Sequence, residues 1–155
     1  MLQPWTQKKI IVQSGLILDS YRHWTGKDLL PKMQDEGERA HQLFEAPFVV
    51  VSHGTEADPI LNYGNKKALE LWEMTWDSFI HTPSRLTTEI VNRKEREQLL
   101  TKVSEQGYSQ DYRGIRISSS GKRFRIEEAV VWNIVDENGV HFGQAAAFKK
   151  WRHLD

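Results

Sequence analysis

The spacing of hydrophobic positions divides the chain into a helical first third and a strand-rich last third. From about Thr6 to Trp24, apolar residues recur at the intervals that place them on one helical face. Ile10, Ile17 and Trp24 mark a stripe along this helix, and Gly26 is a natural stop. Such a stripe commonly packs on its own domain; the alternative is that it pairs with a second copy of the chain.

Short helices and two short strands are expected in the middle of the chain. Residues 38–45 have a helical pattern, whereas residues 48–51 and 60–63 are apolar runs typical of strands. Asn65 stands where it can cap a third helix. Pro83 limits the following segment to short helical pieces.

A longer helix and three strands are expected in the last third. Asn92 and Glu95 have the spacing of a capping box, so a helix is predicted over residues 93–106. Its inward side chains are predicted to be Leu99, Leu100 and Val103. Strands are predicted over residues 108–118, 122–135 and 140–151, separated by the turn sequences SSSG and DENG. This element order indicates an α+β fold, in which helices cover one side of an antiparallel sheet of about five strands.

Composition narrows the classes of function. The 155 residues are enough for one domain. The chain has no cysteine, which excludes disulfides, thiolate metal sites and cysteine nucleophiles, and suits a cytoplasmic location. Basic and acidic residues are equal in number at 21 each, which argues against nucleic-acid binding. No apolar run approaches the roughly 20 residues of a membrane span, so no membrane association is expected.

Several long and irregular strings resemble the MEKHLA domain family, which is PAS-like. They are SYRHWTGKDLL, EAPFVVVSHGTEADPILNYGNKKALELWEMTW, PSRLTTE, YRGIRISSSGKRFRIEEAVVWN and GQAAAF, and they span about residues 21–148. The resemblance implies a sensory or regulatory module that responds to a small molecule or redox state and adjusts dimerisation. It supplies no established ligand and no catalytic residues. Residues 47–155 then form the PAS-like core, and residues 1–46 a helical extension that packs on the core or pairs it with another copy.

Glu128 is out of place in the pattern of the middle strand. Strict alternation places it on the same face as five large apolar side chains, which should be the core face. These are Phe124, Ile126, Val130, Trp132 and Ile134. A β-bulge at Glu127-Glu128 would turn the Glu128 side chain to solvent. Otherwise Glu128 is a buried acid that pairs with Arg113 or Arg116, or that recognises a ligand.

The register of the last hairpin decides where Gln144 points. A type I turn with Gly139 as the bulge residue places Gln144 on the face of Trp132, whereas a two-residue Asn138-Gly139 turn places Ala145 opposite the large rings. In flavin-binding PAS domains a glutamine on the last strand contacts the flavin, and Gln144 looks similar in position. Without cysteine a thiol-linked flavin is impossible, so the resemblance leaves only non-covalent flavin binding open.

Two tryptophans and two polar clusters each have an ordinary structural interpretation. Trp72 and Trp76, four residues apart, either pack in the core or form aromatic walls over a pocket between helices and sheet. The residues His53, Glu56 and Asp58 are more typical of a turn than of a metal site. A basic cluster on neighbouring strands is either a solvated sheet face or a site for an anion or an acidic partner. It consists of Arg113, Arg116, Lys122, Arg123 and Arg125.

Three functions remain open from the sequence. The first is a regulatory module that binds a small, partly aromatic molecule between sheet and helices and forms a homodimer through its N-terminal helix. The second is a protein interaction domain without a ligand. The third is a small enzyme that uses Glu128 as an acid or base; no other catalytic signature is present, so no enzyme is expected. The candidate ligand-binding residues are Trp72, Trp76, Arg116, Glu128, Trp132 and Gln144.

Overall fold

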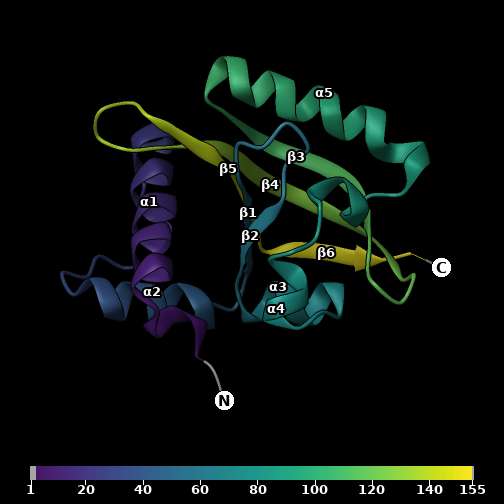
Figure 1. Cartoon of the computed structure of the whole chain (residues 1–155). Helices are drawn as coiled ribbons and strands as arrows, with labels where there is room; N and C mark the ends of the chain where they lie inside the picture. The colour runs from purple at the N-terminus through teal and green to yellow at the C-terminus, as the bar shows by residue number, and fades with distance from the viewer. Residues whose placement is uncertain (1–2, 155) are drawn as a thin grey trace.

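The computed structural model describes residues 3–154, which form one twisted antiparallel sheet with helices on both faces (Figure 1). The strand order is β2-β1-β5-β4-β3, and β6 pairs with the first part of β4. The helices are η1 (Pro4–Thr6), α1 (Lys8–Thr25), α2 (Glu36–Glu45), α3 (Lys66–Trp72), α4 (Trp76–Phe79), η2 (Ser84–Thr87) and α5 (Ile90–Gln106). The strands are β1 (Val49–His53), β2 (Leu61–Gly64), β3 (Tyr108–Ile117), β4 (Arg123–Val135), β5 (His141–Phe148) and β6 (Lys150–His153).

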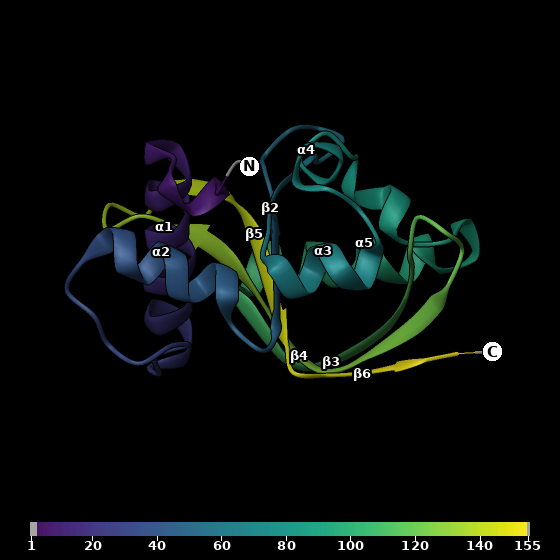
Figure 2. The same ribbon diagram turned by 90° about the horizontal axis from the view of Figure 1, so that it is seen from below.

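The helices form two separate layers. Figure 2 shows α1 and α2 on one side of the sheet and α3, α4 and α5 on the other. Two main hydrophobic clusters match this division, one beneath α1 and α2 and one beneath α3 and α4. The predicted antiparallel sheet with a helical layer is therefore confirmed, and the extra N-terminal helix covers the opposite face. None of the helices within residues 3–154 has both the length and the apolar character needed to cross a membrane.

The apolar stripe of α1 is buried against its own sheet. Ile10 and Ile17 belong to the cluster that contains Trp132, and the indole of Trp24 donates a 2.9 Å hydrogen bond to the carbonyl of Asn133. The Ser20 hydroxyl donates to the Val135 carbonyl and accepts from the Val135 amide, both at 2.8 Å. The stripe thus packs on its own domain, and Gly26 ends the helix in the left-handed conformation as predicted.

Strand β4 changes which side of the sheet its residues face at a β-bulge. Glu128 has a φ of 52°, and the pairing of β4 passes from β6 before this point to β5 after it. Since one extra residue reverses the alternation, Phe124 and Ile126 face α3, whereas Trp132 faces α1. The prediction that the five large apolar side chains of this strand share one face is therefore wrong. The bulge itself was one of the expected alternatives.

A second bulge sets the register of the last hairpin. The Gly139 amide donates to the Asp136 carbonyl, and Gly139 has a φ of 79°, as in a type I turn followed by a bulge residue. Pairing then skips Phe142, so that Gln144 lies opposite Asn133 and Ala145 lies opposite Trp132. The turn is therefore the type I turn of the first predicted alternative. Ala145 nevertheless lies opposite Trp132, as the second alternative predicted. Glycine is required at position 143, next to the skipped Phe142, because a Cβ there would overlap the carbonyl oxygen of His53.

Several predicted boundaries shift by a few residues. Helix α5 begins at Ile90 with Glu89 as its N-cap and without a side-chain capping bond, so the predicted capping box is wrong. The expected last strand divides into β5 and β6. Asn65 does cap α3: its side-chain oxygen accepts from the amides of Ala68 and Val50, at 3.1 Å each.

Candidate functional site

A cavity of about 70 Å³ lies between the sheet and the layer of α3, α4 and α5. Its floor comes from strands β1 to β5, and its roof comes from Trp72, Phe79 and Leu99 on the covering helices. Most of the wall is apolar. The polar and charged lining residues are Ser52, His53, Ser84, Thr87, Arg96, Tyr112, Arg116 and Gln144. The cavity therefore combines an apolar interior with a small number of polar groups, which is the usual composition of a ligand site.

Trp72 is held in the cavity wall by the way α3 ends. The next residue, Glu73, adopts the left-handed conformation and accepts hydrogen bonds from the hydroxyls of Ser118 and Ser120 in the turn between β3 and β4. These bonds lower the pKa of Glu73 to about 2 and tie the helix end to the sheet. Trp72 is 3% exposed, and its buried Nε1 has no hydrogen-bond partner within residues 3–154.

Two arginines reach the same cavity from opposite layers. Arg96 on α5 is 5% exposed, and Arg116 on β3 is 8% exposed. Nη2 of Arg96 donates to the Ser84 hydroxyl at 2.6 Å, and Nη2 of Arg116 donates to the Tyr112 hydroxyl at 3.1 Å. Burial, and then repulsion from Arg116, lowers the pKa of Arg96 to about 10, so Arg96 stays protonated at neutral pH.

His53 and Gln144 contribute polar groups at the β1–β5 side of the cavity. Nδ1 of His53 lies 3.0 Å from the Gly54 carbonyl, and its buried Nε2 has no hydrogen-bond partner in the described part of the chain. Burial lowers the pKa of His53 below 6.5. The side-chain amide of Gln144 points to α5, where its Nε2 donates to the Leu100 carbonyl at 3.0 Å and to Asn133 Oδ1 at 3.1 Å.

Comparison with known proteins identifies the family of this chain. The MEKHLA domain matches residues 12–153. The chain belongs to the MEKHLA domain family. This match confirms the resemblance expected from the sequence, and it begins inside α1.

The relatives of this chain include much longer plant proteins. Homeobox-leucine zipper protein ATHB-14 of Arabidopsis thaliana is 27% identical over 136 residues, which cover 85% of this chain and 16% of that protein. Homeobox-leucine zipper protein HOX9 of Oryza sativa subsp. indica is 26% identical over 137 residues, covering 87% of this chain and 16% of that protein. The chain thus spans about a sixth of the length of these relatives.

Solved structures with the same fold are PAS and light-oxygen-voltage domains. The PAS domain of a protein from Colwellia psychrerythraea has a TM-score of 0.64 and 16% identity, covering 76% of this chain and 94% of that one. A light-oxygen-voltage domain studied with a flavin analogue has a TM-score of 0.60 and 12% identity, covering 76% and 85%. At these identities the likeness shows the PAS-like fold.

Three of the six predicted ligand-binding residues line the cavity between the sheet and α3–α5. Trp72, Arg116 and Gln144 line it. Trp76 begins α4 and packs against Phe44 and Tyr63, in the cluster on the α1 side. It shares no helical face with Trp72, because α3 ends before α4 begins.

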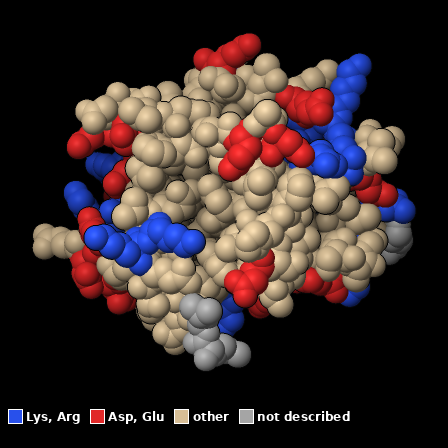
Figure 3. Space-filling model, in the orientation of Figure 1, with Lys and Arg blue, Asp and Glu red and all other residues tan. Residues whose placement is uncertain are grey.

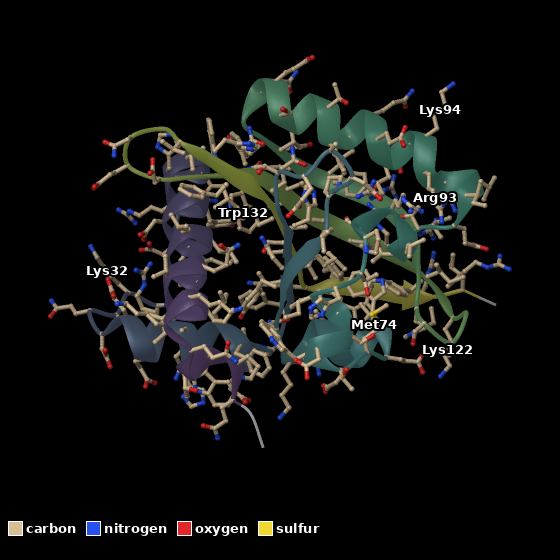
Figure 4. All side chains as sticks on the ribbon, in the orientation of Figure 1. Lys32, Met74, Arg93, Lys94, Lys122 and Trp132 are labelled. Atoms are coloured by element: carbon tan, nitrogen blue, oxygen red, sulfur yellow. The ribbon has the colours of Figure 1, made fainter. Side chains whose placement is uncertain are left out.

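The other two predicted residues, Trp132 and Glu128, lie away from the cavity. Trp132 is fully buried on the α1 side, as its place beside α1 in Figure 4 shows. The Glu128 side chain is 60% exposed and forms a 3.0 Å ion pair with Lys150. The buried acid on which the enzyme alternative depended is therefore a surface residue, as expected for the bulge.

The basic cluster of the sequence divides between surface and interior. Arg113, Lys122 and Arg123 are exposed, and the latter two pair with Glu73 and Glu89. Arg125 is half-buried and pairs with Glu127, as on a solvated face. Arg116 alone among them is buried.

The segment of His53, Glu56 and Asp58 forms the predicted turn. The Glu56 carboxylate accepts a 3.1 Å hydrogen bond from the Ile60 amide, and Asp58 pairs with Arg85. Within residues 3–154 no group of three or more His, Asp and Glu side chains is placed to hold a metal ion.

Arg96 is the charged residue of the cavity that the sequence analysis missed. It lies three residues before Leu99 and seven before Val103, both of which face the sheet. These intervals place a charged residue on the apolar stripe of α5. That break in the stripe was the available signal.

Proposed function

We propose that this chain is a regulatory PAS-like module that binds a small molecule in the cavity between the sheet and α3–α5. The observation that supports this proposal is a mostly apolar cavity lined by residues with buried polar atoms that have no hydrogen-bond partner within residues 3–154. Trp72 Nε1 and His53 Nε2 are two such groups. Since an unsatisfied buried donor or acceptor costs about 1–3 kcal/mol, a molecule that bonds to them would bind favourably.

The size of the cavity limits its ligand. An apolar cavity of about 150 Å³ is known to hold benzene. At about 70 Å³, this cavity suits a ligand of a few non-hydrogen atoms. A three-ring flavin would require the covering helices to move outward, so we do not propose flavin as the ligand.

Native mass spectrometry of protein purified gently from its source tests the proposal. The wild-type protein should carry a non-covalent mass that denaturation releases. Ala146→Leu should abolish this mass, because Ala146 lines the cavity and three added carbons fill it. Ala147→Leu is the matched control, since Ala147 is the next residue of β5 and packs on the α1 side. An empty wild-type protein would contradict the proposal.

Homodimerisation is a second proposed activity. It would use a different surface of α1 from the one that the sequence predicts. The predicted dimer used the apolar stripe of α1, which is buried within the chain. A dimer through α1 would therefore use its outer face, where Val12 is 55% exposed. Light scattering should give twice the mass of one chain, and Val12→Asp should halve it; a monomeric wild-type protein would contradict this activity.

A nucleic-acid partner is not proposed. Figure 3 shows side chains of both charges interspersed on one face of the molecule, and the formal net charge is zero. Nucleic-acid sites are typically continuous basic surfaces. Binding to a random-sequence DNA or RNA duplex at low salt would contradict this expectation.

A further inference from the structure

Arg96 and Arg116 place two buried positive charges in the lining of one cavity, from its helical side and its sheet side, without an ion-pairing carboxylate among residues 3–154. Within residues 3–154, neither guanidinium lies within ion-pair distance of an Asp or Glu side chain. Arg116 is near enough to Arg96 for their charges to repel. A buried charge without a partner is strongly unfavourable, so it calls for an anion.

The protein contacts use only a small part of the hydrogen-bonding capacity of this pair. A guanidinium has five N–H donors. Within residues 3–154, Arg96 makes one hydrogen bond, to Ser84, and Arg116 makes two, to the Ile115 carbonyl and the Tyr112 hydroxyl. The remaining donors are available to a ligand.

The nearest acids are engaged elsewhere or exposed. The Glu95 carboxylate accepts a 3.0 Å hydrogen bond from the Tyr112 hydroxyl. It is therefore linked to Arg116 only through this hydroxyl, which accepts a hydrogen bond from Arg116. Asp58 pairs with Arg85 at 3.1 Å, and Glu97 is exposed on α5. These groups weaken the repulsion between the two arginines but do not fill the cavity.

The rest of the wall is suited to an apolar group. Leu61, Phe79, Ile126 and Phe148 line the cavity, and each belongs to the hydrophobic cluster beneath α3 and α4. Trp72 lies among them with its buried Nε1 free to donate. The site therefore combines cationic donors, an apolar lining and a further neutral donor.

We infer that the ligand of this cavity is a small organic anion whose carboxylate binds Arg96 and Arg116 and whose short apolar part packs against Trp72 and Phe79. This inference rests on the proposed function, because it assigns a chemical class to the molecule proposed there. A carboxylate matches the planar guanidinium fork. Inorganic phosphate has no apolar part and would leave the remaining wall without contacts.

Calorimetric titration of the full chain with butyrate tests the inference, with butyramide as a neutral probe of the same shape and phosphate as an anion without an apolar part. Chloride replaces each added anion so that ionic strength stays constant, because all anions screen exposed arginines. Butyrate should bind saturably and more tightly than either butyramide or phosphate.

Substitutions at the two arginines give the second part of the test. Arg96→Met and Arg116→Met should each weaken butyrate binding about tenfold or more, as expected for a lost charge-assisted hydrogen bond. Lys94→Met is the matched control: Lys94 is exposed on the same helix and points away from the sheet in Figure 4, so its loss should leave binding unchanged.

The thermal midpoint without ligand separates a ligand site from a structural one. Since each methionine removes an unpaired buried charge, both variants should unfold at the wild-type temperature or above it. If either variant fails to fold, Arg96→Lys or Arg116→Lys keeps the charge but loses the planar fork, and should still weaken binding.

The outcomes distinguish this inference from the function on which it rests. Equal binding of butyrate and butyramide, stronger binding of phosphate, or full binding by the arginine variants would overturn the carboxylate assignment. If purified protein carries a neutral molecule in the cavity, the proposed function stands and this inference fails. If the protein carries nothing and none of the probes binds, both fail.

Discussion

The indole Nε1 of Trp132 donates a 3.3 Å hydrogen bond to the backbone carbonyl of Ile17. This bond joins strand β4 to the middle of α1, on the side of the sheet opposite the cavity. Tyr21 lies edge-on to the same indole, with 5.0 Å between ring centroids. Trp132 therefore fixes the N-terminal helix to the sheet and belongs to the structural layer.

Trp132→Ala should lower the free energy of unfolding by about 3–5 kcal/mol, because it empties a fully buried site. Urea unfolding followed by circular dichroism measures this change. Trp132→Phe should cost less, since it keeps the ring but loses the bond to Ile17. A nearly neutral Trp132→Ala would mean that α1 does not dock as described.

Replacement of Glu128 by glycine should stabilise the protein by about 0.5–1 kcal/mol. The left-handed conformation costs a residue with a side chain about 1–2 kcal/mol, and the greater freedom of an unfolded glycine offsets part of this gain. The exposed ion pair with Lys150 contributes little. Glu127→Gly, one position earlier in the regular part of β4, should destabilise; equal losses for both would argue against the bulge.

Asn65→Ala should lower the free energy of unfolding by about 2–4 kcal/mol. The side chain is fully buried, and its Nδ2 donates to the carbonyls of Leu43 and Phe48 in addition to the bonds its oxygen accepts. Asn65→Ser should lose less, because serine can still cap α3. Chemical denaturation compares the two variants, and an equal loss would restrict the role of Asn65 to tertiary contacts.

Stability should rise with pH below 6.5 through His53. Because burial lowers its pKa in the folded state, only the unfolded chain binds a proton there between 6.5 and the lower folded value. The free energy of unfolding then falls as the pH falls through this window, by at most about 1.4 kcal/mol per pH unit. His53→Gln should reduce this slope, measured by urea unfolding from pH 5 to 7.5; an unchanged slope would contradict the assignment.

The sequence predicts elements defined by local chemistry. Gly26 and Asn65 mark the end of α1 and the start of α3 because their backbone or side chain satisfies helix termini directly. The turn at Gly139 was among the predicted alternatives for the same reason. The PAS-like sheet was predicted from short continuous sequence strings that resemble the MEKHLA family.

The faces of β4 and β5 could not be predicted by alternation alone. Each bulge shifts the register by one residue. As a result, Trp132 and Glu128 lie away from the cavity, whereas Gln144 lines it. The position of a bulge depends on tertiary contacts, such as the approach of Gly143 to His53. Arg96 was overlooked because a single charge on an apolar stripe becomes meaningful only once Arg116 is seen on the facing strand.

A crystal structure of the protein purified from its own source is the decisive measurement of whether the cavity holds a ligand. Electron density for a small molecule should appear between the sheet and α3–α5, in contact with Arg96 and Arg116. A cavity closed by side chains, or one that holds only ordered water with both arginines turned to carboxylates of the chain, would contradict this expectation.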